Sequence, residues 1–133
     1  ILEDATVPRS EIAKMVSAIN EIAKKNDVKI CTFGHAGDGN LHPTCITDSR
    51  NEDEIKRVDQ AFLEIFEKAI ELGGTITGEH GVGMMKAPYL EMKLGKEGIN
   101  AMIAIKHSFD PNNIMNPGKV FAKDSRKRVV ITK

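Results

Sequence analysis

Two short glycine-rich segments hold three of the four histidines of the chain. Residues 34–42 read GHAGDGNLH, and residues 78–83 read GEHGVG. Glycine permits the positive φ angles and close backbone approaches of tight turns, whereas imidazoles and carboxylates are donors that bind divalent transition metals. The pattern therefore predicts two turns that bring histidine and acidic side chains together.

Strand-like stretches flank the first of these segments. Residues 28–34 (VKICTFG) and 41–47 (LHPTCIT) are rich in β-branched residues, and the Gly-Asp-Gly-Asn turn between them favours a hairpin. With residues 36–41 as the loop, His35 pairs with His42. Both imidazoles are then predicted to lie on one face of the sheet.

The same register decides the fate of the two cysteines. It pairs Phe33 with Thr44 and Cys31 with Ile46, and it places Cys45 on the face opposite to Cys31. An intrachain disulfide would need a one-residue slip that also separates the histidines. Because two cysteines make no disulfide framework, a reducing compartment is favoured. The expected location is the cytoplasm, with membrane association through partner subunits as the alternative.

Periodicity and turn residues predict the remaining elements. In chain order they are a strand in residues 1–8, a helix in 10–25 capped by Ser10, the two hairpin strands, a helix from a capping box at Ser49 and Glu52 to Gly73, a strand in 75–77, a short helix in 89–93, a second one containing 99–106, and a turn at 110–113. The order β-α-β-β-α-β, followed by short C-terminal helices, matches an α+β fold. We expect a ferredoxin-like split β-α-β sandwich, with helices on one face of an antiparallel sheet whose first and third strands are central.

Composition excludes several classes of partner. At 133 residues and 41% hydrophobic content, the chain can bury one modest core, so one compact domain is expected. Nineteen basic and nineteen acidic residues give zero formal net charge, which disfavours nucleic acid as a partner, and no apolar run is long enough for a transmembrane segment.

Residues 122–133 are basic and are predicted to be a tail or an edge strand. A start at Ile1 indicates a piece of a longer protein.

Four side chains of the two glycine-rich segments form a candidate site. His35, His42 and Glu79 supply the donors of a divalent metal site with open positions for substrate. His80 would turn towards a bound substrate, where an imidazole can accept a proton. Either hairpin histidine alone would be interpreted as a turn residue that is hydrogen-bonded to backbone. Together with Glu79 and His80 in residues 78–83, the two histidines instead favour a metal site. Asp38 is interpreted as a turn residue, with orientation of a ligand as the alternative.

Three motifs in series resemble a known family. Residues 34–42, 78–83 and 109–119 (FDPNNIMNPGK) are similar in order and spacing to the C-terminal part of FAD-linked 2-hydroxy acid dehydrogenases, the vanillyl-alcohol-oxidase-type flavoproteins. Their branch contains the glycolate oxidase D subunit, D-lactate dehydrogenase and D-2-hydroxyglutarate dehydrogenase. The resemblance covers about residues 3–121 and includes residues 3–8 (EDATVP), which look like the family's entry into this half-domain.

The resemblance implies a role for each site residue. His35, His42 and Glu79 match the family's ligands for zinc or a similar divalent ion. His80 matches the catalytic proton acceptor at the substrate. Thr44 stands where some members have a substrate-contacting asparagine. The implied reaction is oxidation of a D-2-hydroxy acid to the 2-oxo acid, with hydride passing to FAD.

The resemblance also implies partners. Asn116 matches a position near the flavin, but the FAD-binding domain of the family lies N-terminal to this region. Residues 1–121 are therefore expected to be a substrate and metal half-domain that alone neither binds FAD tightly nor turns over substrate. Further expected partners are a small 2-hydroxy acid and either a second copy of the chain or an electron-transfer subunit. The alternatives are a stand-alone metal-binding or interaction module with a ferredoxin-like fold, and a purely structural subunit.

Overall fold

A computed structural model describes residues 1–121 of the chain. They form two compact units, the first spanning Ile1–His80 and the second starting at Gly81. The length of the chain predicts one compact domain, whereas the described residues form two compact units. The tail or edge strand predicted for residues 122–133 lies outside the described residues.

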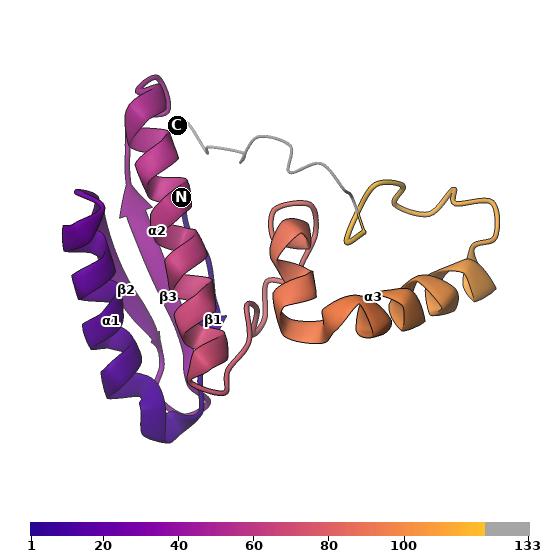
Figure 1. Ribbon diagram of the computed structural model, residues 1–133, viewed down its shortest axis with the longest axis horizontal. Helices are drawn as coiled ribbons and strands as arrows, with labels where there is room; N and C mark the ends of the chain where they lie inside the picture. The colour runs from indigo at the N-terminus through magenta and orange to yellow at the C-terminus, as the bar shows by residue number, and fades with distance from the viewer. Residues whose placement is uncertain (122–133) are drawn as a thin grey trace. The chain divides into compact units, whose positions relative to one another are not determined.

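The first unit is a small antiparallel sheet with two helices on one face (Figure 1). Its elements are β1 (Ala5–Thr6), η1 (Arg9–Glu11), α1 (Ile12–Lys25), β2 (Lys29–His35), β3 (Asn40–Ile46) and α2 (Glu52–Glu71). The strand order is β1-β3-β2, and a single bridge from Thr75 to Thr6 adds a fourth position beside β1. This order confirms the predicted α+β, ferredoxin-like arrangement. The strand predicted at residues 75–77 is only this bridge.

The core of the first unit lies between the two helices and the sheet. The largest fully buried apolar side chains, spaced three or four residues apart on each helix, are Met15 and Ile19 of α1 and Val58, Phe62, Ile65 and Phe66 of α2. Burial of such a stripe is the main source of helix stability in a small protein. The helical periodicity of the sequence therefore predicted this core correctly.

The hairpin forms as predicted, but its register differs by two residues. His35 pairs with Asn40, and Phe33 pairs with His42. The backbone N–H groups of Asp38 and Gly39 donate to the carbonyl of His35, so the loop closes over residues 36–39. The Asp38 carboxylate accepts the N–H of Asn40 at 2.9 Å, which confirms Asp38 as a turn residue.

A contact with Val7, the residue after β1, supports the shorter loop. Gly39 has a φ of 83° and accepts the N–H of Val7, and a β-carbon on Gly39 would lie 2.0 Å from the Val7 carbonyl oxygen. Only glycine fits this position. Because the shift is two residues, His35 and His42 still share a face and Cys31 and Cys45 still lie on opposite faces. Both cysteines are free, as the predicted faces require.

Neither predicted helix cap forms. Ser10 lies inside η1, and neither η1 nor α1 has a side-chain cap. At α2 the cap is Asn51, whose side chain accepts the N–H of Glu54 at 3.1 Å, rather than Ser49. Asn51 occupies the Ncap position. It stands three residues before Glu54, the same spacing that Ser49 has to Glu52.

Asn51→Ala is expected to lower the free energy of unfolding by about 1 kcal/mol, because it leaves an N-terminal N–H of α2 without its acceptor. Urea denaturation followed by circular dichroism measures this change. Ser49→Ala is the matched control and should leave the midpoint unchanged. Equal effects of the two substitutions would contradict the Asn51 cap.

The second unit is built around α3. A short η2 (Ala87–Tyr89) leads into α3 (Leu90–Phe109), which is interrupted at Gly95, where φ is 65° and ψ is 175°. This break divides α3 into the two helical stretches that the sequence predicts. Within the described part of the chain, no helix combines the length and apolar character that crossing a bilayer requires.

The turn after α3 is organised by Asp110. Its carboxylate accepts the N–H groups of Ile114 and Met115, each at 2.9 Å, and pairs with the Lys106 ammonium. The hydrogen bond from Lys106, followed by those from the two backbone N–H groups, lowers the pKa of Asp110. The turn predicted at residues 110–113 is thus confirmed. The carboxylate of its first residue, Asp110, accepts backbone N–H groups from the two residues after the turn.

Candidate metal and substrate site

The two faces of the sheet differ in what covers them. Leu41 and Cys45 of β3 are buried on the helix-covered face, whereas Phe33 and His35 of β2 are exposed on the opposite face. We call the face opposite to the helices the open face. His42 lies on the open face, because side chains alternate along a strand and its neighbour Leu41 lies on the helix-covered face. The site is therefore built on the side of the sheet away from α1 and α2.

A loop after the Thr75 bridge brings Glu79 and His80 to the open face. One carboxylate oxygen of Asp4, a fully buried residue, accepts the backbone N–H groups of Gly78, Glu79 and His80 at 2.7, 2.8 and 3.2 Å. The Thr77 hydroxyl donates to the same oxygen at 3.4 Å. Three consecutive N–H groups on one acceptor fix the course of this loop.

The loop also needs a residue without a side chain at its first position. A β-carbon on Gly78 would lie 2.4 Å from the Thr6 hydroxyl oxygen and 2.5 Å from Cγ of Asn40. Those two side chains are themselves joined by a hydrogen bond of 2.9 Å from Thr6 to Asn40. Gly78 therefore allows the loop to approach β1 and β3 closely.

Three donor atoms converge at the end of the hairpin. Glu79 Oε1 lies 3.0 Å from His42 Nε2 and 3.5 Å from His35 Nε2. The ligand atoms of the three residues all lie within 4.8 Å of one another. Both histidines thus approach the same carboxylate oxygen from the hairpin.

The donor set fits a divalent transition metal. Metal–donor bonds of about 2.1 Å put neighbouring donors about 3.0 Å apart at right angles and about 3.4 Å apart in a tetrahedron. The two histidine–glutamate distances, 3.0 and 3.5 Å, match this spacing. Two imidazoles and one carboxylate leave coordination positions open. His35 and Glu79 are about half exposed, so these positions are accessible.

Aromatic rings enclose His42. His80 stacks on it with ring centroids 5.1 Å apart and an interplanar angle of 25°, and His35 meets it edge-on at 5.2 Å. Phe33 lies on another side at 5.5 Å. These neighbours explain why the His42 side chain is only 6% exposed on a face that α1 and α2 do not cover. His80 Nε2 lies 3.8 Å from Glu79 Oε1, so this ring stands next to the three donors.

The structure brings together four of the six site residues that the sequence singles out. Thr44 follows two residues after His42 on the same face of β3, and its hydroxyl donates to the His42 carbonyl at 3.4 Å. Asn116 belongs to the second unit, where it is exposed on a turn with a φ of 47°. The cluster of His35, His42, Glu79 and His80 therefore comes from the first unit alone.

Sequence reasoning missed the role of Asp4. The sequence offers one signal for it, because Leu2, Asp4 and Thr6 alternate onto one face of a strand that was predicted to be central. A carboxylate on a central strand is rarely buried without several donors. The donors themselves come from a loop more than seventy residues away along the chain, as the sequence separations of 74 to 76 show.

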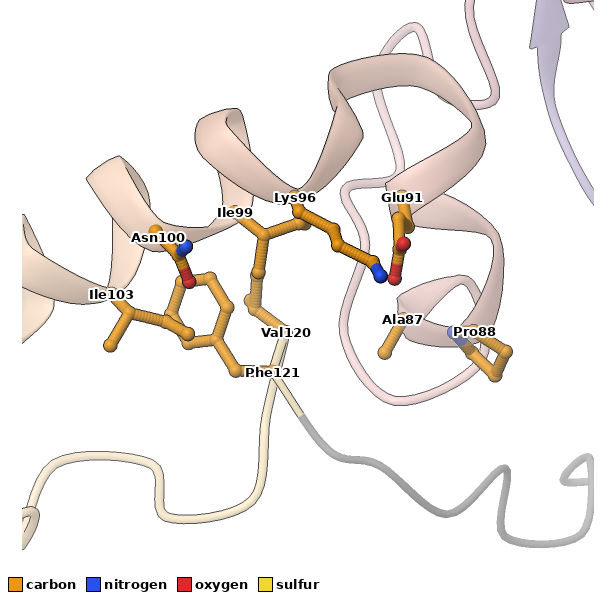
Figure 2. Close-up of a pocket in the computed structure, with 9 residues that line it drawn as sticks. All are labelled: Ala87, Pro88, Glu91, Lys96, Ile99, Asn100, Ile103, Val120 and Phe121. Atoms are coloured by element: carbon orange, nitrogen blue, oxygen red, sulfur yellow. The ribbon is translucent and has the colours of Figure 1, made fainter.

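The second unit contains a pocket of about 600 Å³. It is lined by Ala87, Pro88, Glu91, Lys96, Ile99, Asn100, Ile103, Val120 and Phe121. Figure 2 shows the side chains of Glu91 and Lys96 pointing toward one another, with Asn100 and apolar side chains along the rest of the wall. None of the site residues that the sequence singles out lines this pocket.

Comparison with known proteins gives a consistent family. Residues 1–120 match the family described as FAD linked oxidases, C-terminal domain. Glycolate oxidase subunit GlcD of Bacillus subtilis (strain 168) is 81% identical over 130 residues, which are 98% of this chain and 28% of that protein. D-lactate dehydrogenase of Anaerostipes hadrus is 40% identical over 121 residues, which are 90% of this chain and 26% of that protein.

A third relative extends the range of substrates named among these proteins. D-2-hydroxyglutarate dehydrogenase of Stutzerimonas stutzeri (strain A1501) is 39% identical over 123 residues, which are 90% of this chain and 26% of that protein. The chain thus spans between 26% and 28% of the length of these three relatives. Because the family match covers residues 1–120 of 133, the chain belongs to the FAD linked oxidases, as their C-terminal domain.

Proposed function

We propose that this chain is the substrate- and metal-binding part of an FAD-dependent oxidoreductase that oxidises a D-2-hydroxy acid, such as glycolate or D-lactate, to the 2-oxo acid. The observation that carries the proposal is the convergence of His35, His42 and Glu79, with His80 beside them, in a chain of this family. The names of the relatives support the class of substrate. In this proposal residues 1–121 act as a half-domain of a longer enzyme.

His35, His42 and Glu79 would hold the divalent ion, which we propose to be zinc. Their spacing and donor chemistry suit it, and one carboxylate with two imidazoles leaves room for two substrate oxygens. A divalent ion held by these three residues would supply Lewis-acid chemistry, attracting the carboxylate and hydroxyl oxygens of the substrate and favouring loss of the hydroxyl proton. The half-exposed side chains of His35 and Glu79 leave that approach open from solvent.

His80 would accept the hydroxyl proton. Its ring is 39% exposed and stacks against the ligand His42, so a substrate on the metal side of the cluster comes within reach of Nε2. Thr44, on the same face, is proposed to contact the substrate through its hydroxyl. FAD would supply the acceptor for the hydride that the substrate carbon loses.

FAD would be held mainly by an N-terminal FAD-binding domain of the parent chain. Asn116 is the position of this chain proposed to lie near the flavin, and it is exposed on its turn. One exposed amide does not make a cofactor site. The chain alone is therefore proposed not to turn over substrate, so its function is tested by binding.

Cobalt(II) tests the substrate part of the proposal, since its visible absorption changes when a ligand enters its coordination shell. The chain is loaded with one equivalent of Co²⁺, and D-lactate is added. We expect the cobalt spectrum to change, because the carboxylate and hydroxyl can chelate the ion together. Propionate is the matched control, since it lacks only the hydroxyl, and it should change the spectrum less.

Two results would contradict the proposal, and they differ in meaning. Failure to bind Co²⁺ would remove the metal site. Binding of Co²⁺ with the same spectrum in buffer, D-lactate and propionate would favour the stand-alone metal-binding module instead.

A further inference from the structure

We propose that Asp4 is the positioning residue of this site. Its buried carboxylate holds the backbone of residues 78–80, and it thereby sets where the Glu79 carboxylate and the His80 ring stand. The inference rests on the proposed function, because it concerns the same metal and proton-accepting groups, and it assigns a role to a residue outside the three donors.

The hydrogen-bond geometry singles out this carboxylate. Asp4 Oδ2 accepts the N–H groups of Gly78, Glu79 and His80 at 2.7, 2.8 and 3.2 Å. Hydrogen bonds to an ionised acceptor are about twice as strong as those between neutral groups. Asp4 is 0% exposed, so water does not compete for these bonds. The backbone of the loop is therefore held at three successive residues.

Glu79 has little else to fix its position. Its side chain is 51% exposed, and the interactions of its carboxylate are with His35, His42 and His80 in the described residues. The two histidines stand on paired strands of the hairpin, whereas Glu79 stands on a loop without regular secondary structure. The distance between the glutamate and the histidines thus depends on where Asp4 holds the loop.

The same carboxylate lies next to the ring of His80. Asp4 Oδ1 is 3.5 Å from His80 Nδ1, while His80 Nε2 is 3.8 Å from Glu79 Oε1. One nitrogen of the ring therefore faces the buried carboxylate, and the other faces the metal ligand. A carboxylate on one side of an imidazole orients the ring so that its other nitrogen points to the reacting groups. Asp4 in this way orients both residues that follow Gly78.

A purely structural role for Asp4 predicts something different. A residue that only stabilises the fold lowers the melting temperature when it is replaced, but the folded protein keeps its affinity for the metal. A positioning residue changes the metal affinity of the folded protein as well. Zinc affinity and thermal stability therefore distinguish the two roles without any measurement of enzyme activity.

The test uses Asp4→Asn in the full chain. Asparagine keeps the shape and one acceptor oxygen, but it loses the charge that strengthens the three backbone hydrogen bonds. We expect zinc to bind about 10–100-fold more weakly by isothermal calorimetry, measured well below the melting temperature of the zinc-free variant. Asp27→Asn is the matched control, because Asp27 belongs to the same unit and its side chain is 95% exposed, and its zinc affinity should equal that of the wild type.

The outcomes separate this inference from the proposed function. A folded Asp4→Asn variant with wild-type zinc affinity would overturn the positioning role and leave the metal site standing. If Asp4→Asn does not fold, Asp4→Glu replaces it, since the charge is kept and the added methylene displaces the carboxylate from the loop; unchanged affinity there would overturn the inference in the same way. A wild-type chain that binds no zinc would overturn the proposed metal site, and this inference with it.

Discussion

His42→Ala is expected to abolish stoichiometric zinc binding by this chain. His42 is the most buried of the three donors, at 6% side-chain exposure, and its Nε2 makes the shortest contact of the cluster, 3.0 Å to Glu79. Removing it leaves one imidazole and one carboxylate, both about half exposed, which are too few for a stable site. Zinc content after dialysis, measured by atomic absorption, should fall from one equivalent to near none.

The chain supplies its own control for this experiment. His107 is the remaining histidine and lies exposed on α3, in the second unit. His107→Ala should retain a full equivalent of zinc, while His35→Ala should lose it as His42→Ala does. Full retention by both His35→Ala and His42→Ala would remove the assignment of the metal ligands.

Phe66→Ala is expected to destabilise the first unit by about 3–5 kcal/mol, a cost typical of deleting a fully buried aromatic ring and leaving a cavity. Phe66 is 0% exposed and packs beside Phe62, with ring centroids 6.3 Å apart. Domains of this size have about 5–15 kcal/mol of stability in total, so the change removes a large part of it. Urea unfolding monitored by circular dichroism measures the difference in the midpoint.

Phe109→Ala serves as the control for this substitution. The side chain of Phe109 is 84% exposed at the end of α3, so its removal should change the stability by no more than about 0.5 kcal/mol. A loss at Phe109 as large as that at Phe66 would contradict the assignment of Phe66 to the core and of Phe109 to the surface.

The parts of the fold that local patterns determine were predictable. The apolar positions of α2 recur at helical spacing, and they are the residues that the structure buries. The shared face of His35 and His42 was also predictable, because alternation along a strand depends only on whether positions are odd or even. Family resemblance then implied a role for each of the site residues.

What the sequence did not reveal depends in part on which of several local hydrogen bonds forms, and in part on contacts between distant segments. The loop of the hairpin is four residues rather than six because Asp38 accepts the N–H of Asn40 and Gly39 accepts the N–H of Val7, the residue after β1. Ser49 and Asn51 are both suitable N-cap residues by type. Asn51 is the cap in the structure, because α2 begins at Glu52. Asp4 acquires its role only when residues 78–80 come to lie against β1, which no local pattern shows.

The cluster joins two parts of the chain that α2 separates. His35 and His42 belong to the hairpin, and Glu79 follows α2 and the Thr75 bridge. An ion that binds all three binds only the folded state, so it stabilises the fold by mass action, by about 2.7 kcal/mol when its free concentration is 100 times its dissociation constant. The proposed catalytic ion would then also cross-link the hairpin to the segment that follows α2. The thermal stability of this small unit would consequently follow the availability of metal in its surroundings.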